Sequence, residues 1–275
     1  MTTPTPTPTT PPTTPPTTTP TTTPTTPPEN NLRKVTEEMP RRGEGAGGKK
    51  EYWVDEQNRI QGISVRTFRM GQRAETPYVD GKVEGVYRYY QRHGVLVTEK
   101  FFRGGKLEGR GTWWHSNGEV SSECDFERGK PVRLLKHTDS QGRDLILPEG
   151  EIEVWKACKS EGVGVYVRLR VPADARRVTP IDTQASLGGR SCKSRVEYAI
   201  VVGIEDEAGK PYQEATSFVY KKGEGLVYRV GEIVRPDGYD PNLGRGCGRG
   251  INVHRYRDHC TSWFKKLRMN RVPAS

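Results

Sequence analysis

Apolar and polar side chains alternate along much of the chain after about residue 51, which predicts a succession of short β-strands. The run 85–90 is rich in strand-forming residues, and a second such run spans 95–102. Within the second run one face would carry Leu96, Thr98, Lys100 and Phe102, because successive side chains of a strand point to opposite sides. Gly94 lies between the two runs, so the predicted local unit is a β-hairpin.

The same pattern returns with a period of 24 residues. Glycine–lysine pairs recur at that interval, each three residues after an aromatic side chain, and a second set of glycines recurs at Gly94, Gly118 and Gly142. This fixed spacing predicts a repeat array, in which hairpins too thin to fold alone stack and bury a continuous aromatic stripe. We expect the repeat turns at Gly81, Lys82, Gly105, Lys106, Asn117, Gly118, Gly129 and Lys130.

Two further sets of residues keep the 24-residue interval. In the pairs Tyr89-Tyr90 and Trp113-Trp114, alternation predicts one ring in the core and one exposed ring. Glu99 and Glu123 occupy equivalent places, and we expect them on the wet face against lysine and arginine rather than as a catalytic acid–base pair.

Together these features resemble the MORN (membrane occupation and recognition nexus) repeats, in the variant with a Tyr-Tyr or Trp-Trp pair, an Asn-Gly turn and a Gly-Lys turn. The clear copies are 78–101 and 102–125, and a truncated third begins at Phe126. The resemblance implies an antiparallel hairpin array over 51–147, with less regular spacing after Lys130. Such repeats occur in scaffolds, in membrane-proximal modules and as appendages of enzymes.

The 24-residue rhythm ends before Glu151, and a different β-rich pattern covers 151–267. We expect a compact β-rich (α+β) domain there, with a capping strand at 145–147 before it and a short helix at 253–264. Its predicted strands span 153–158, 164–171, 195–204, 217–220 and 226–234. The fold class predicted for the chain is therefore mainly β.

The second half carries a second resemblance. The segments Val171–Arg177, Ser191–Ser194, Val201–Asp206, Tyr228–Glu232, Val234–Asp237 and Cys247–Ile251 occur in this order. This order is similar to that of an uncharacterised domain that follows repeats in phages and in large DNA viruses of the marseillevirus type. The resemblance covers 155–264 and implies a viral context but no activity. The His-Phe-Phe ending usual in that family is replaced here by Asn252-Val253-His254.

Composition defines the remaining segment and the compartment. Residues 2–28 contain only threonine and proline, so we expect 1–50 to form a disordered tail followed by a charged linker. Apolar residues make up 32% of the chain, and no run is long enough to span a bilayer. The five cysteines are scattered without a Cys-x-x-Cys pair, and the chain shows no signal segment at its start. These features predict reduced thiols and an intracellular location, and the viral resemblance implies that this is a host cytoplasm or a virion.

Charge is concentrated in the second half. The net charge is +10, of which residues 151–275 contribute +7 and residues 51–150 contribute +1. Such an excess can attract nucleic acid or anionic lipid. The last 15 residues hold four cations and no acid, and we expect these to contact anions: Lys265, Lys266, Arg268 and Arg271.

Two groups of residues are candidates for chemistry. The potential zinc ligands Cys247, His254, His259 and Cys260 lie within 14 residues, but their spacing matches no common finger and favours ordinary packing. The run Gly244–Gly250 could wrap an anion with its backbone amides, although it lacks the ending of a phosphate-binding loop and is more typical of a turn. We predict no cofactor and no catalytic residue.

The sequence therefore favours a non-enzymatic repeat scaffold that binds a protein partner or an anionic membrane surface. Two alternatives stay open. One is non-specific nucleic-acid packaging through the basic half. The other is an enzyme, for which the strand after Cys247 is faintly similar to a strand of ADP-ribosyl-transferring folds.

Overall fold

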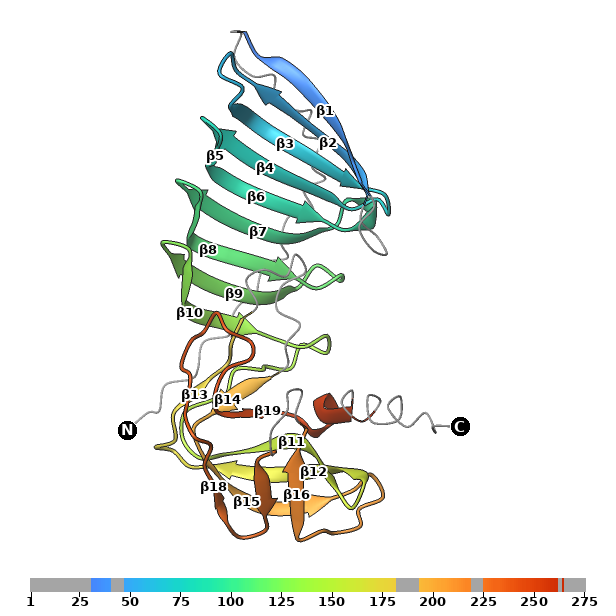
Figure 1. Cartoon of the computed structure of the whole chain (residues 1–275), viewed down its shortest axis with the longest axis vertical. Coiled ribbons are helices and arrows are strands. Elements are labelled where there is room, and N and C mark those ends of the chain that lie inside the picture. Colours follow the sequence, from blue (N-terminus) through green and yellow to red (C-terminus); the bar gives the residue numbers. More distant parts are fainter. Residues whose placement is uncertain (1–30, 41–46, 182–192, 219–224, 262–263, 265–275) are drawn as a thin grey trace, which may run out of the picture.

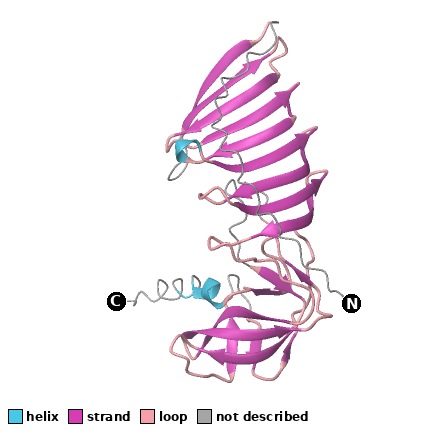
Figure 2. Cartoon of the chain, turned by 180° about the vertical axis from the view of Figure 1, so that it is seen from behind, coloured by secondary structure: helices cyan, strands magenta, loops and turns pink. Residues whose placement is uncertain are grey.

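The computed structural model describes residues 31–40, 47–181, 193–218, 225–261 and 264. It is mainly β, as predicted: a ten-stranded sheet comes first, and the strands of a six-stranded and a three-stranded sheet alternate along the second half of the chain (Figure 1). Figure 2 shows that strands and loops make up nearly all of the described chain. None of the described residues forms a helix long and apolar enough to cross a membrane.

The repeat sheet contains ten antiparallel strands stacked in one layer along the long axis of the molecule (Figure 1). Its order is β1-β2-β3-β4-β6-β7-β8-β9-β10, and the short β5 pairs with β4. The strands are β1 (Arg33–Met39), β2 (Gly48–Val54), β3 (Ile60–Phe68), β4 (Arg73–Val79), β5 (Lys82–Val83), β6 (Gly85–Tyr90), β7 (Leu96–Arg103), β8 (Lys106–Trp114), β9 (Val120–Glu127) and β10 (Lys130–His137).

The period found in the sequence is present in the backbone. Along one edge, two-residue loops join the strands at 80–81, 104–105 and 128–129, and both residues of each loop have positive φ. Gly105, at φ +79°, shows why glycine occupies the second position, since other residues adopt this conformation only with strain. Glu108 connects successive loops, because its carboxylate accepts the Arg128 N–H at 3.0 Å, as Glu84 accepts that of Gly104 at 2.6 Å.

The aromatic stripe lies on the face that carries Trp113, which we call the aromatic face. Trp113 is fully buried and its ring centroid lies 6.2 Å from that of Phe126. The pairs Tyr87–Phe102 and Phe68–Tyr89 repeat this contact at 6.3 and 6.1 Å. Edge-to-face and tilted ring pairs of this kind supply the core that a single hairpin lacks.

The opposite face, which we call the outer face, is polar and ion-paired. Arg88 meets Glu99 at 2.9 Å, and Asp125 receives Arg110 at 2.7 Å and Arg133 at 2.8 Å. Glu123 lies 3.9 Å from Arg110, so the placement predicted for both glutamates is confirmed. Hydrogen bonds from Arg133 and Arg110 hold the pKa of Asp125 below its ordinary value.

The C-terminal part contains a six-stranded sheet, ordered β17-β16-β11-β12-β15-β18, and a three-stranded sheet, β13-β14-β19. Their inner faces form one apolar core that includes Val154, Val167, Leu169 and Ile251. The strands are β11 (Ile152–Ser160), β12 (Val163–Val171), β13 (Arg177–Val178), β14 (Ser194–Val196), β15 (Ala199–Glu205), β16 (Glu214–Ser217), β17 (Val227–Arg229), β18 (Ile233–Val234) and β19 (Ile251–Val253).

Several predicted boundaries differ from the structure. The repeat sheet begins at Arg33, inside the predicted 1–50 tail and linker, because β1 pairs with β2 over seven residues. The rest of that segment, 1–30 and 41–46, lies outside the described residues. No strand forms at 145–147. These residues belong to a loop, in which Leu145 and Leu147 are each buried.

The predicted strand 195–204 is two strands in two different sheets. Val196 and Ala199 are both fully buried, so the strict alternation of one strand breaks between them and the chain bends. The predicted strand 226–234 is likewise divided, by a turn at Gly231 with φ +87°. Where a helix was expected from residue 253, the chain first ends β19 and forms a short 3₁₀ turn, η2 (Arg257–Cys260), and helical residues begin only at Thr261.

The prediction of one exposed ring in each aromatic pair is also wrong for the first pair. Tyr90 is only 4% exposed, because Arg73 lies over its ring at 4.7 Å and Glu75 accepts its hydroxyl at 3.2 Å.

The loop geometry makes a prediction for Gly105. Gly105→Val should lower the free energy of unfolding by about 1–3 kcal/mol, because a β-branched side chain resists positive φ. Glu127→Gln, at an exposed position beside the next loop, is the matched control and should be near neutral. Urea unfolding of both variants measures the difference, and equal stabilities would contradict the turn assignment.

Candidate functional site

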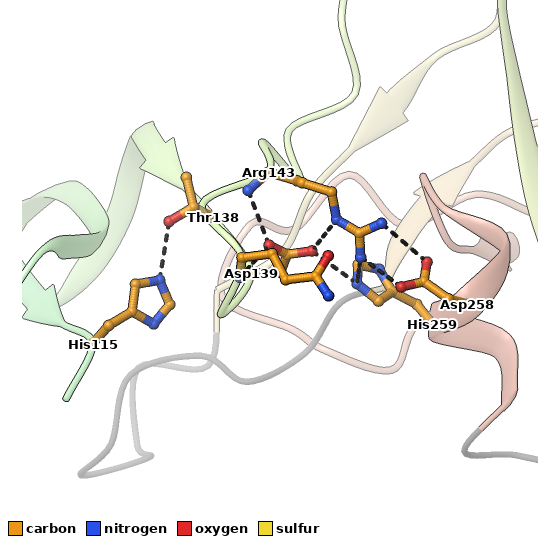
Figure 3. Close-up of polar contacts among 7 residues, drawn as sticks. His115, Thr138, Asp139, Arg143, Asp258 and His259 are labelled. Carbon is orange, nitrogen blue, oxygen red and sulfur yellow. Dashed lines mark hydrogen bonds and ion pairs between the residues drawn. The ribbon is translucent and has the colours of Figure 1, made fainter. Parts of the chain in front are cut away.

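A polar cluster lies where the repeat sheet meets the C-terminal part (Figure 3). We call it the junction cluster and define it as Asp139, Arg143, Asp258 and His259. Asp139 begins the last repeat turn, in which its carbonyl accepts the Gly142 N–H at 3.0 Å. The equivalent turns begin at Gln91 and His115, so the 24-residue period itself brings Asp139 to the end of the sheet.

Asp139 is the centre of the junction cluster and is 7% exposed. Its Oδ1 accepts the N–H groups of Gln141 and Arg143, both at 2.9 Å. Its Oδ2 accepts Nε of Arg143 at 2.7 Å and lies 3.1 Å from His259 Nε2. Desolvation raises the pKa of Asp139, but the hydrogen bonds from Arg143 and Gln141 outweigh it, and the pKa is below its ordinary value.

Arg143 joins the two parts of the molecule. Its guanidinium donates to both carboxylate oxygens of Asp258, at 3.3 and 2.6 Å, and lies 4.3 Å from the centroid of the Tyr256 ring. The hydrogen bond from Arg143 is the main reason why the pKa of Asp258 is lowered. Because Asp258 belongs to η2, one arginine ties the last repeat turn to the C-terminal end of the described chain.

The geometry of the junction cluster suits a structural link between the repeat sheet and the C-terminal part. Nε2 of His259 lies 3.1 Å from Oδ2 of Asp139 and 3.1 Å from a terminal nitrogen of Arg143. An aspartate–histidine contact can serve acid–base chemistry, but here Arg143 lies between the two carboxylates and pairs with both, so the cluster works as a link between two parts of the chain. Nearby, His115 Nε2 lies 3.1 Å from the Thr138 hydroxyl (Figure 3), which extends the polar contacts across the sheet edge.

An apolar contact accompanies this polar one. Ile181 is fully buried and packs with Trp113, Cys124 and Phe126 on the aromatic face. The Ile181 N–H donates to the Leu243 carbonyl at 2.8 Å, and Leu243 packs on the same cluster. Side chains from the C-terminal part therefore complete the core of the last repeats.

The glycine-rich run 244–250 is organised around Arg195, which is fully buried. Its guanidinium donates to the carbonyls of Asp240, Arg245 and Asn242 at 2.7, 2.9 and 3.0 Å. A Cβ on Gly250 would lie 2.7 Å from the Arg195 side chain, so glycine is needed there for close approach. These carbonyls face an internal cation, which favours a structural loop over an anion-binding one.

The structure does not bring the four potential zinc ligands together, in line with the packing role that their spacing favoured. Cys260 is buried, while Cys247 is exposed and lies 3.5 Å from Lys193 Nζ. The rings of His254 and His259 are 6.4 Å apart, and His259 is engaged in the junction cluster. Among the described residues, no group of three or more His, Cys, Asp or Glu side chains has the arrangement of a metal site.

The predicted repeat-turn residues lie at the two long edges of the repeat sheet. Gly81, Gly105 and Gly129 are in the two-residue loops, and Lys82, Lys106 and Lys130 are exposed at the strand starts that follow. Asn117 and Gly118 form a turn at the opposite edge. The four predicted anion contacts, Lys265, Lys266, Arg268 and Arg271, lie outside the described residues.

Sequence reasoning missed Arg143, Asp258, Ile181 and Arg195. One signal was present, since Gly142 keeps the 24-residue spacing and marks the turn that holds Asp139 and Arg143. The other three lie outside the repeat and depend on contacts across 45 or more residues, as between Arg195 and Asp240.

A comparison with protein families identifies the C-terminal part. Residues 143–260 match a family of unknown function, DUF5758, and so form a domain of that family. The match begins at Arg143 and includes Asp258 and His259, whereas Asp139 belongs to the repeat sheet. No curated protein matches the chain.

The junction cluster makes a prediction for stability. Arg143→Met should lower the free energy of unfolding by about 1–3 kcal/mol, because the buried Asp139 carboxylate loses its charged partner. Arg229→Met is the matched control, since Arg229 pairs with Glu214 at 2.7 Å but both side chains are more than half exposed. Thermal or urea unfolding measures both changes. Equal losses of unfolding free energy in the two variants would show that the junction stabilises the fold no more than an exposed ion pair does.

Proposed function

We propose that the protein is a non-enzymatic scaffold in which a MORN-type array is fixed to the DUF5758 domain and presents binding surfaces for a protein partner or an anionic membrane. The observation that carries this proposal is the junction. There the most elaborate group of charged side chains in the described chain is engaged in joining the two parts. The apolar contact of Ile181 with Trp113 also joins the two parts.

The distribution of charge suggests which part meets an anionic partner. On the outer face arginines are paired with acidic neighbours, as Arg110 and Arg133 are with Asp125 and Glu123. Residues 151–275 carry +7, of which +5 comes from residues outside the described ranges, so the described domain itself has a net charge of +2. We therefore assign weak anion binding to the terminal segment 265–275, which supplies four of these charges.

Nucleic-acid packaging is the second candidate, and it rests on the same charges. Its binding would be non-specific, because counterion release from phosphates requires cations but no shaped site. A viral origin is proposed on the resemblance of 155–264 to domains of phages and large DNA viruses.

The enzymatic alternative has less support from the described residues. It depended on the strand that follows Cys247, yet Gly248 and Gly250 in that region pack against Arg195. Their role in the loop explains the glycines without a catalytic function.

The proposal predicts salt-sensitive binding by the full chain. Vesicles of phosphatidylserine and phosphatidylcholine should bind at low salt, and binding should fade between about 50 and about 200 mM salt. Replacing Lys265, Lys266, Arg268 and Arg271 by glutamine should remove most of this binding, as measured by vesicle co-sedimentation.

The matched control removes the same charge from the array, through glutamine at Lys82, Lys106, Lys130 and Arg103, and should retain most of the binding. Loss of binding in this control instead would place the functional surface on the array. Salt-resistant binding to one headgroup, or stronger binding to single-stranded DNA than to vesicles, would also contradict the proposal.

A further inference from the structure

The strand β1 forms an end of the repeat sheet. It pairs with β2 over Arg33–Met39 without a register shift, and within the described part of the chain it has no other strand partner. Five of its seven residues are exposed. A strand at a sheet edge has unpaired backbone N–H and C=O groups, which makes it a template for another strand.

The opposite end of the repeat sheet is protected. The strand β10 contains Pro131 and has two register shifts against β9, both of which disfavour pairing with a further strand. A Cβ on Gly244 of the C-terminal domain would lie 3.0 Å from Pro131, so that domain also approaches this end. The strand β1 has no proline, no glycine and no bulge.

The charges of β1 are ordered so that the strand complements itself. Its first two residues, Arg33 and Lys34, are cations, and Glu37 and Glu38 near its end are anions. In an antiparallel pair of two such strands the positive end of each copy lies beside the negative end of the other. In a parallel pair, like charges would lie side by side, which is unfavourable.

We propose that two copies of the chain associate through β1 in antiparallel orientation, with Thr36 of each copy opposite Thr36 of the other. This register pairs all seven residues and obeys a two-fold axis perpendicular to the sheet. It places Lys34 directly opposite Glu38 of the second copy, on the same face, and it does so twice.

The side chains are available for these contacts. Lys34 is about half exposed, at 51%, and shares Glu51 with Lys49 at 2.9 and 3.3 Å. Glu38 is exposed and has no ion pair among the described residues. Lys49 of β2 lies opposite Glu38 but pairs with Glu51, so the second copy supplies a cation on the open side of Glu38.

The dimer should be weak. One strand-to-strand contact of seven residues buries much less than the roughly 1,600 Å² of a standard stable interface. Its symmetric contact closes on itself, so association stops at two copies and joins two repeat sheets edge to edge.

A first experiment uses cysteine cross-linking in the full chain. Thr36→Cys, with Cys192 and Cys247 changed to serine, should form a disulfide-linked dimer on mild oxidation. Lys34→Cys in the same background is the control, because residue 34 and its copy would lie about 14 Å apart, too far for a disulfide. Equal cross-linking of both variants would overturn the proposed register.

A second experiment tests the charges without cross-linking. Sedimentation velocity of the native chain over a roughly hundredfold concentration range should show a monomer–dimer equilibrium. Lys34→Glu and Glu38→Lys should each weaken the dimer about tenfold, since each places like charges opposite one another twice. The double variant should restore association.

The double variant distinguishes a loss of pairing between the two copies from local damage to β1. Like the Lys34→Glu variant, it lacks the Lys34–Glu51 ion pair within one chain, so any fraying of β1 caused by that loss would persist in it. The contacts between the two copies, in contrast, are re-formed with reversed charges. A native chain that stays monomeric at every concentration, or a double variant no better than the single ones, would overturn the proposal.

Discussion

The structure depends on the attachment of the last repeat turn to the DUF5758 domain. Stacked hairpins have an end at which the core would face water, and covering that end keeps the apolar stripe out of solvent. Here Ile181 of the domain completes the core around Trp113, and Arg143 links Asp139 of the turn to Asp258 of the domain. The domain is therefore the cap of the array as well as its neighbour in the chain.

The same constraint explains how a chain with few apolar residues folds. The repeats contribute pairs of aromatic rings in edge contact and glycine loops, and Glu84 and Glu108 connect each loop to the next. The outer face carries arginines paired with acidic side chains, so the array has little net charge of its own. In the domain, the buried Arg195 orders the loop 240–245 by donating hydrogen bonds to its main-chain carbonyls. Without this arginine, the loop would have to be held by a large apolar core.

Local patterns predicted the parts of the fold that local interactions determine. The 24-residue period was sufficient to place the glycine loops and the ring stripe, because both follow from strand alternation and turn chemistry. It missed β1, whose charged sequence has no apolar alternation and which forms by pairing with β2. It also missed the division of 195–204, because Val196 and Ala199 are directed to two sheets by contacts distant in sequence. The junction cluster could not be predicted for the same reason, since Arg143 and Asp258 lie 115 residues apart.

The central claim is that array and domain form one rigid unit. The most direct measurement is a distance distribution between spin labels at two exposed positions, Gln57 on the array and Ala208 on the domain, by pulsed electron resonance of the full chain. The account predicts one narrow distribution, unchanged by salt, because the apolar contact of Ile181 with Trp113 is fully buried and Asp139 is shielded from solvent. A broad or multimodal distribution would contradict it, since it would mean that the two parts move independently.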